Sequence, residues 1–246
     1  MLNGTGQLQN VVLFGGNSDI GLAILKKLPM ARDSTLILVG RNLNYNQVAS
    51  KFPESNVEII EFDFENIDKI DILFSIISKQ RDIDVAILAY GYLGEVGTDT
   101  LLREINQQIL NNYYGPAMLF SKLFERFQTQ KHGKILVITS VAGIRPRISN
   151  FVYGSAKSGL DFLVRGSQNE SKKNNFTVSV LRPGFVESKM THGLKPPAFS
   201  VKPDRVAEDA VKGLLRQKKI IYSPTILKYI FTLLRFSPDF VFNKLK

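Results

Sequence analysis

The chain has 246 residues, of which 44% are hydrophobic, and its 32 lysines and arginines against 22 acidic residues give a net charge of +10. This length and composition predict one α/β domain with a buried core. The absence of cysteine excludes disulfides and thiolate chemistry, and two histidines are too few for a histidine-rich metal centre, so no metal is expected. The charge favours phosphate or anionic lipid as a partner, and the dispersed basic residues argue against nucleic acid.

Residues 10–27 contain the first pattern with a chemical meaning. An apolar run, NVVLF, tightens at Gly15 and Gly16 and continues as the helical pattern IGLAILKKL. This strand, glycine turn and helix is typical of dinucleotide binding, because glycine lets the backbone approach a pyrophosphate and the helix N-terminus attracts its charge. An ordinary tight connection between a strand and a helix would look the same, so the rest of the chain must decide.

The second predicted strand, STLILV, ends at Val39 and is followed by Gly40 and Arg41. An acidic residue near this point would bind the ribose diol of NAD, whereas a guanidinium suits the 2′-phosphate of NADP. The predicted cofactor is therefore NADP or NAD, with NADP favoured by Arg41. The alternative is that Arg41 is a solvated surface residue.

The alternation of strand and helix continues along the chain, with strands predicted at 57–64, 84–91, 134–140 and 177–183 and helices at 67–79 and 104–127. The pattern predicts an α/β fold with a single Rossmann-type, doubly wound parallel sheet. We assign residues 1–222 to this domain and residues 223–246 to an amphipathic, basic C-terminal tail of the same domain. The first ten residues lack the basic and apolar regions of a secretory signal, so a cytoplasmic location is expected.

The stretch from Ser140 to Lys157 combines three side chains suited to acid–base chemistry on a carbonyl. Tyr153 and Lys157 lie one helical turn apart, so the ammonium is expected beside the phenol, where it would lower the tyrosine pKa from about 10 and make Tyr153 a general acid. Ser140 ends the apolar strand KILVITS, where its hydroxyl would reach a carbonyl oxygen. A tyrosine and lysine at this spacing are also common on helix surfaces, so the pair indicates chemistry only together with the other motifs of the chain.

Several motifs occur in one order along the chain: Gly15-x3-Asp19-Ile20-Gly21, Asp63 at a strand end, Asn112-Tyr113-Tyr114-Gly115, Ser140, Tyr153-x3-Lys157 and Arg182-Pro183-Gly184. With them, the segment from about residue 10 to residue 222 resembles the short-chain dehydrogenase/reductase family. The resemblance implies that Tyr153 exchanges a proton with the substrate oxygen and that Ser140 positions this oxygen. It also implies that Lys157 holds the nicotinamide ribose, that Asn112 anchors a proton-relay water, and that dimers or tetramers form on the long helices.

The same motifs supply the residues expected to contact the cofactor. They are Gly15, Asn17, Ser18, Asp19, Ile20, Gly21, Arg41, Asp63, Phe64, Ala89, Gly91, Tyr153, Lys157, Pro183, Gly184 and Val186. Two positions depart from the family pattern. Asp19 stands in place of the middle glycine of the turn, and Leu88-Ala89-Tyr90-Gly91 stands in place of the usual Asn-Asn-Ala-Gly.

Longer strings, among them LFGGNSDIGLAI, DVAILAYGYLG and VLRPGFVESKM, resemble a narrower group of reductases that act on polyprenyl-phosphate-linked keto pentoses in cell-wall arabinan synthesis. This resemblance implies a polyprenyl-phosphate 2-keto-erythro-pentofuranose as substrate and an FAD-dependent oxidase as the partner that supplies it. Three alternatives remain open: a reductase of another lipid-linked or nucleotide-linked keto substrate, an NADP(H)-binding regulator without turnover, and a sugar-nucleotide epimerase or dehydratase, which normally needs a longer chain.

Three flanking segments have weaker signals. Residues 224–246 interleave apolar and basic side chains, and their longest apolar run, YIFTLL, is far below the roughly 20 residues that span a bilayer. The tail is therefore expected either to lie peripherally at the inner face of the plasma membrane or to pack on protein. Residues 188–203 are expected to form a substrate lid. The loop residues Arg145 and Arg147 lie where they could meet a substrate phosphate, but arginines in loops are usually solvated, and this is the expectation here.

Overall fold

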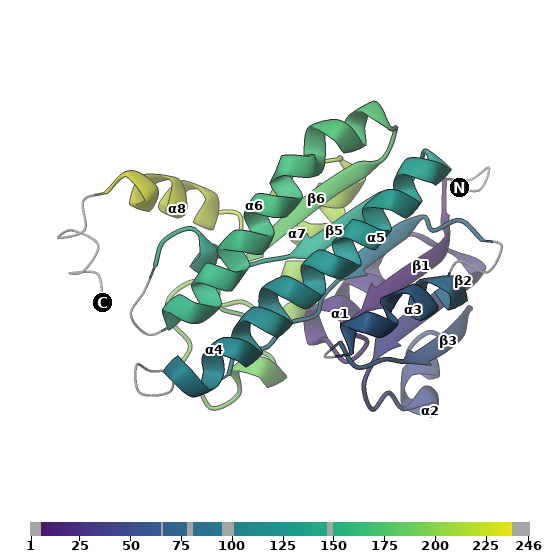
Figure 1. The fold of residues 1–246 in the computed structure, drawn as a ribbon, viewed down its shortest axis with the longest axis horizontal. Coiled ribbons are helices and arrows are strands. Elements are labelled where there is room, and N and C mark those ends of the chain that lie inside the picture. The colour runs from purple at the N-terminus through teal and green to yellow at the C-terminus, as the bar shows by residue number, and fades with distance from the viewer. Residues whose placement is uncertain (1–5, 65, 78–80, 95–100, 147–149, 238–246) are drawn as a thin grey trace.

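In a computed structural model, residues 6–64, 66–77, 81–94, 101–146 and 150–237 are described, without the side chains of residues 101–104. The strands are β1 (Leu8–Phe14), β2 (Met30–Gly40), β3 (Ser55–Glu61), β4 (Val85–Leu88), β5 (Lys134–Ile138), β6 (Thr177–Pro183) and β7 (Ile220–Ser223). They form one parallel sheet in the order β3-β2-β1-β4-β5-β6-β7 (Figure 1). The predicted doubly wound parallel sheet is confirmed.

The α-helices are α1 (Asp19–Lys27), α2 (Tyr45–Ala49), α3 (Ile70–Ile77), α4 (Leu101–Ile109), α5 (Gly115–Gln130), α6 (Phe151–Lys173), α7 (Pro203–Leu215) and α8 (Leu227–Phe236). Short helical turns are η1 (Ile67–Lys69), η2 (Leu110–Tyr114), η3 (Val141–Gly143) and η5 (Lys189–Thr191). Among the described helices, none is long and apolar enough to cross a membrane.

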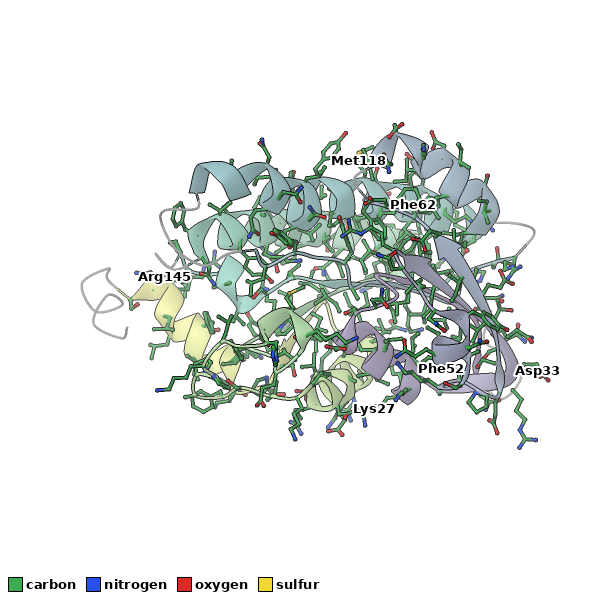
Figure 2. The ribbon with its side chains drawn as sticks, turned by 90° about the horizontal axis from the view of Figure 1, so that it is seen from below. Lys27, Asp33, Phe52, Phe62, Met118 and Arg145 are labelled. Carbon is green, nitrogen blue, oxygen red and sulfur yellow. The ribbon has the colours of Figure 1, made fainter. Side chains whose placement is uncertain are left out.

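Two apolar cores lie on the two faces of the sheet. One contains side chains of α1 and α7, and the other contains side chains of α3, α5 and α6. Figure 2 shows this arrangement from below, with Met118 of α5 and Lys27 of α1 on opposite sides of the sheet. Because both faces are covered, β4 is apolar throughout, and β1 and β5 contain continuous apolar runs at residues 11–14 and 135–138, the usual composition of buried parallel strands.

The predicted helix over 104–127 is interrupted by a short π-helix. Residues Leu110–Tyr114 form the π-helical turn η2 between α4 and α5, and the buried side chains of Asn111 and Asn112 lie on it. π-helical turns of this kind are frequent at functional sites. Three further elements, α2, α7 and the edge strand β7, were not among the predicted elements.

Candidate active site

The predicted site residues gather at the carboxyl ends of the strands, where ligands bind in open parallel sheets. The turn after β1 carries Gly15 to Ser18, Asp63 and Phe64 follow β3, and Ala89 to Gly91 follow β4. Ser140 follows β5, and Gly184 follows β6. The structure therefore places the candidate residues from five strands along one edge of the sheet.

The glycine turn after β1 is built for a close approach of backbone. Gly15 has a φ of +92°, and a Cβ atom there would lie 2.9 Å from the carbonyl carbon and oxygen of Ala89. Ser18 caps α1, because its Oγ accepts a hydrogen bond of 3.1 Å from the Gly21 amide. The turn thus opens onto the free amides of a capped helix N-terminus, an arrangement suited to a pyrophosphate.

Arg41, which follows β2, and Asp63, which follows β3, form an ion pair near the glycine turn. The guanidinium nitrogen lies 3.5 Å from the Asp63 carboxylate, and both side chains are substantially exposed. Asn17 donates a 2.7 Å hydrogen bond to the Arg41 carbonyl and so ties the glycine turn to the end of β2. Arg41 lines the cavity above the turn, where a cation can meet a phosphate on the ribose.

Residues 88–91, which differ from the Asn-Asn-Ala-Gly pattern described above, have a structural role in this protein. The ring of Tyr90 lies against that of Phe64, with centroids 4.1 Å apart, and the Tyr90 hydroxyl donates a hydrogen bond to Asn111. Asn111 in turn donates to the Gln107 carbonyl at 2.9 Å. Tyr90 therefore forms one wall of the cofactor cavity and is fixed there by the π-helical turn.

Asn112 lies beneath the cavity and is fully buried. Its Oδ1 accepts from the Tyr92 amide at 3.0 Å, and its Nδ2 donates to the Tyr92 carbonyl at 2.6 Å and to Gln108 at 2.8 Å. The side chain thus anchors the loop after β4. Pro116 has no amide hydrogen, so it cannot supply the donor that a regular α-helix would give to the Asn112 carbonyl.

Ser140, Tyr153 and Lys157 meet at the carboxyl end of β5. Two glycines allow η3 to pack tightly on α6: a Cβ at Gly143 would lie 2.8 Å from the Ser158 amide nitrogen, and one at Gly154 would lie 2.8 Å from the Ala142 carbonyl. This contact brings the Ser140 hydroxyl near the Tyr153 hydroxyl, where its polarity favours the phenolate. The Lys157 Nζ lies 5.8 Å from the centroid of the Tyr153 ring.

Burial dominates the ionisation of both groups on α6. Loss of water raises the pKa of Tyr153 to about 12, and the Ser140 hydroxyl offsets this only in part. Burial also lowers the pKa of Lys157 to about 8. The pKa of Tyr153 is therefore raised in the protein alone, opposite to the expected lowering, because the loss of water outweighs the contribution of Ser140. A phenol that stays protonated at neutral pH is still able to donate a proton.

Ser140, Tyr153 and Lys157 line a cavity that adjoins the cavity above the glycine turn. A cavity of about 500 Å³ contains Ser140, Tyr153 and Lys157 on its walls together with Pro183, Gly184 and Val186. A second cavity of about 300 Å³ contains the glycine turn and Arg41. Both are lined by Ser18, Ile20, Ala89, Tyr90, Gly91, Ser188 and Met190. A dinucleotide that extends along these shared residues would place its two ends at Arg41 and at Tyr153.

The segment predicted as a lid is fastened to the glycine turn by Asp19. The Asp19 carboxylate accepts a 2.8 Å hydrogen bond from the Lys189 amide and lies 3.5 Å from the Lys189 ammonium. At the base of this segment, Val186 and Val201 form an isolated parallel bridge. The aspartate that replaces the middle glycine therefore links the glycine turn to the segment predicted as a lid.

Arg145 is not simply solvated. It donates hydrogen bonds to the carbonyls of Leu234 at 3.2 Å and Arg235 at 3.4 Å, at the C-terminal end of α8 (Figure 2). A cation at this end satisfies carbonyls that lack a helical partner and complements the helix dipole. The contact joins residues 89 and 90 positions apart, so no local sequence pattern indicates it. Arg147 lies outside the described residues.

The cavity residues fit a nicotinamide dinucleotide. Close backbone approach at Gly15, a capped helix N-terminus and an arginine at the outer end match the pyrophosphate and the ribose phosphate. A Cβ at Gly91 would lie 3.0 Å from the Lys157 Nζ, so glycine at this position gives the ammonium room beside the loop after β4. Among the described residues, no cluster of acidic, histidine or cysteine side chains that would hold a metal is present.

Comparisons with known proteins agree with this geometry. The model of the short chain dehydrogenase family matches residues 9–198. An uncharacterized oxidoreductase of Mycobacterium tuberculosis strain H37Rv is 32% identical over 241 residues, with 96% of each chain covered. An uncharacterized oxidoreductase of Streptomyces coelicolor is 26% identical, with 98% of this chain and 97% of the relative covered.

Solved structures share the fold. A short chain dehydrogenase from Burkholderia cenocepacia J2315 in complex with NADP has a TM-score of 0.80 at 16% identity, covering 97% of this chain and 98% of that one. A short-chain dehydrogenase from Sphingobium yanoikuyae in complex with NADPH has a TM-score of 0.81 at 21% identity, covering 97% and 95%. From the matched family model and the relatives across nearly the whole chain, we conclude that this protein belongs to the short-chain dehydrogenase family of oxidoreductases.

Proposed function

We propose that this protein is an NAD(P)H-dependent reductase of a keto sugar carried on a polyprenyl phosphate, the 2-keto-erythro-pentofuranose that becomes the arabinose donor for cell-wall polysaccharide. The observation that carries the proposal is the meeting of Ser140, Tyr153 and Lys157 on the wall of one cavity, which shares lining residues with the cavity above the glycine turn. Related folds bind NADP or NADPH, which supports this cofactor class here.

The residues of the site divide the work of a carbonyl reduction. When bound, the reduced nicotinamide supplies the hydride that the carbonyl carbon receives. The Ser140 hydroxyl positions the carbonyl oxygen, and Tyr153 gives this oxygen its proton, so that the ketone becomes an alcohol. Lys157 lies close enough to stabilise the phenolate left on Tyr153, which a proton relay through the Asn112 carbonyl would restore.

The sugar and its carrier rest on the resemblance of the longer sequence strings and on the apolar walls of the cavity. Phe185, Phe199, Leu227 and Phe231 all line the space that contains Tyr153. Such walls suit a substrate with a large apolar part better than a nucleotide-linked sugar, which would need polar groups for its base and phosphates. An FAD-dependent oxidase is the proposed source of the ketone, because oxidation of the 2-hydroxyl must precede this reduction.

The test is a coupled reaction. The polyprenyl-phosphate keto-pentose is supplied with NADPH or NADH, absorbance of the reduced cofactor is followed, and the arabinose product is identified by chromatography and mass spectrometry. We expect product with the native chain and none with Tyr153→Phe, which keeps the ring and removes the proton. If the native chain reduces a simple ketone and leaves this keto-pentose unchanged, the substrate assignment is wrong while the oxidoreductase class stands.

A further inference from the structure

The C-terminal helix α8 forms part of the catalytic cavity. Leu227 and Phe231 lie one turn apart on this helix, are only 6% and 3% exposed, and line the same cavity as Tyr153 and Lys157. Figure 1 shows that α8 lies outside the two helical layers that cover the sheet. Its contribution is therefore to the mouth of the site rather than to the two main cores.

The position of α8 is fixed by several contacts. Leu227 and Phe231 form a small apolar cluster with Val141, which directly follows Ser140. A Cβ at Gly184 would lie 2.5 Å from the Leu227 Cδ1, so this glycine lets the helix reach the end of β6. At the other end of α8, Arg145 holds the last carbonyls. Because both ends are tied to loops that carry site residues, the wall is a built part of the cavity.

The lid completes this apolar space. Leu194, Pro197, Ala198 and Phe199 line the same cavity, and Leu194 and Phe199 are 40% and 56% exposed. Large apolar side chains that remain exposed at the rim of a cavity mark a place where an apolar ligand is buried. The cation of Lys195, which lies among these residues, also lines the cavity. The mouth thus offers apolar surface with a positive charge close to it.

We propose that Leu227 and Phe231 of α8, together with Leu194 and Phe199 of the lid, form a subsite for the apolar chain of an amphiphilic phosphate substrate. The inference rests on the proposed function for the position of the ketone at Tyr153, and adds the residues that select substrates by their chain. The occupant is an isoprenoid or similar hydrocarbon chain, because the walls named here offer it no hydrogen-bonding side chain, and the anionic head group lies near Lys195.

The test compares two ligands with one head group and different chains. Dimethylallyl phosphate and farnesyl phosphate, the latter below its micelle concentration, are titrated into the full chain with saturating NADP, and heat is measured. We expect farnesyl phosphate to bind at least about tenfold more tightly, because the longer chain buries more apolar area. Phe231→Ala and Leu227→Ala should each lose most of this preference and leave binding of the short ligand unchanged.

Tyr229→Ala is the matched control, because Tyr229 lies on the same helix but is 65% exposed and is not among the cavity-lining residues. It should keep the full chain-length preference, and circular dichroism confirms that each variant is folded. The proposal is overturned if the two ligands bind equally to the native chain, or if Tyr229→Ala loses as much as Phe231→Ala. Failure of the keto-pentose reduction with an intact chain-length preference would reject the proposed sugar and leave the subsite standing.

Discussion

The Asp161 carboxylate on α6 accepts two hydrogen bonds from the Arg182 guanidinium on β6, both at 2.7 Å. The two residues are 5% and 8% exposed, and Arg165 adds a third bond to Asp161 at 2.6 Å. Asp161 lies one turn beyond Lys157, and Arg182 precedes Pro183 and Gly184. The buried pair therefore locks the helix that carries the acid–base groups to the strand end that lines the cavity.

Breaking this pair is predicted to destabilise the fold. Asp161→Asn leaves Arg182 buried without its counter-charge, so we expect the free energy of unfolding in urea at neutral pH to fall by about 3–5 kcal/mol. Asp71→Asn is the matched control, because Asp71 is 75% exposed in its pair with Lys122, and it should change little. A loss no larger than that of the control would show that the pair is not a structural lock.

The same variant has a predicted pH dependence. Burial opposes ionisation of Asp161, but its hydrogen bonds and the charges of Arg182 and Arg165 prevail and hold its pKa below the ordinary value of 3.8. The stabilisation is therefore complete above pH 3.8 and is lost as pH falls through the lowered pKa of the folded state. The difference between the native chain and Asp161→Asn should be constant near neutrality and shrink in strong acid.

Replacing Lys157 is predicted to stabilise the protein. Burial lowers the pKa of Lys157 from 10.5 to about 8. At neutral pH the charged, buried ammonium therefore lowers the free energy of unfolding by about 3 kcal/mol. Lys157→Met keeps the stem without the charge, so we expect a higher free energy of unfolding by up to this amount, with loss of reductase activity.

The stability gained by Lys157→Met has a predicted pH dependence. Below pH 8, Lys157 is protonated in both the folded and the unfolded state, and the native chain has the full loss of stability. This loss disappears as pH rises from about 8 to 10.5, because the ammonium of the folded state is deprotonated first. The advantage of Lys157→Met in urea denaturation should therefore close over this range, whereas Lys212→Met, on the exposed side of α7, should show no such change. An unaltered gap at alkaline pH would contradict the assigned cause.

The parallel direction of the strands and the alternation of strands and helices could be predicted from the sequence because they follow from local patterns. Apolar runs that end in glycine or proline mark β1 and β6, and the helices between them require parallel connections. The nearness of Tyr153 and Lys157 follows likewise from helical spacing. Features that depend on distant partners were not accessible: Asp19 binds Lys189 across 170 positions, and Arg145 binds the end of α8.

Burial explains the remaining differences between the sequence predictions and the structure. The spacing of Tyr153 and Lys157 indicates that two groups meet, but it carries no information on how much water surrounds them, and loss of water decides both pKa values. The π-helical turn at 110–114 is likewise set by tertiary hydrogen bonds of Asn111 and Asn112, which a helical apolar pattern does not reveal.

Asp19 is predicted to hold the lid against the cofactor turn. Asp19→Gly restores the glycine usual in the family and removes the acceptor of the Lys189 amide, so trypsin should cleave after Lys189 several times faster in limited proteolysis. Asp19→Asn keeps an oxygen acceptor and should protect the lid nearly as well as the native residue. Equal cleavage of all three proteins would show that the contact does not restrain the lid.

Arg41 is predicted to set the preference for NADPH. Its pairing with Asp63 is exposed and weak enough to yield to a 2′-phosphate, which offers more acceptors. Arg41→Ala should reduce kcat/KM for NADPH roughly ten- to hundredfold, the value of one or two charge-assisted hydrogen bonds, and leave that for NADH within about twofold. A parallel fall with both cofactors would mean that Arg41 supports the turn rather than the phosphate.

The outer face of α8 is predicted to contact anionic membranes. While Leu227 and Phe231 face the cavity, Leu233 and Phe236 are 74% and 79% exposed, and Lys228 and Arg235 lie on the same helix. The helix thus packs on the protein with one side and leaves apolar and basic groups outward, so the two alternatives drawn from the sequence are compatible. Residues 238–246, with the tail's last lysines, lie outside the described residues.

Removing the whole tail would also open the catalytic cavity, so substitutions on the exposed face give the cleaner experiment. The double variant Leu233→Gln and Phe236→Gln should lose more than about tenfold in affinity for phosphatidylglycerol vesicles in a flotation assay, since each buried apolar side chain contributes about 1.5–3 kcal/mol. Ile72→Gln with Phe162→Gln, equally exposed on other helices, is the control and should float like the native chain. Binding should weaken with added salt, because the lysine and arginine contributions are screened. Flotation of the α8 variant equal to that of the native chain would rule out this face as the membrane contact.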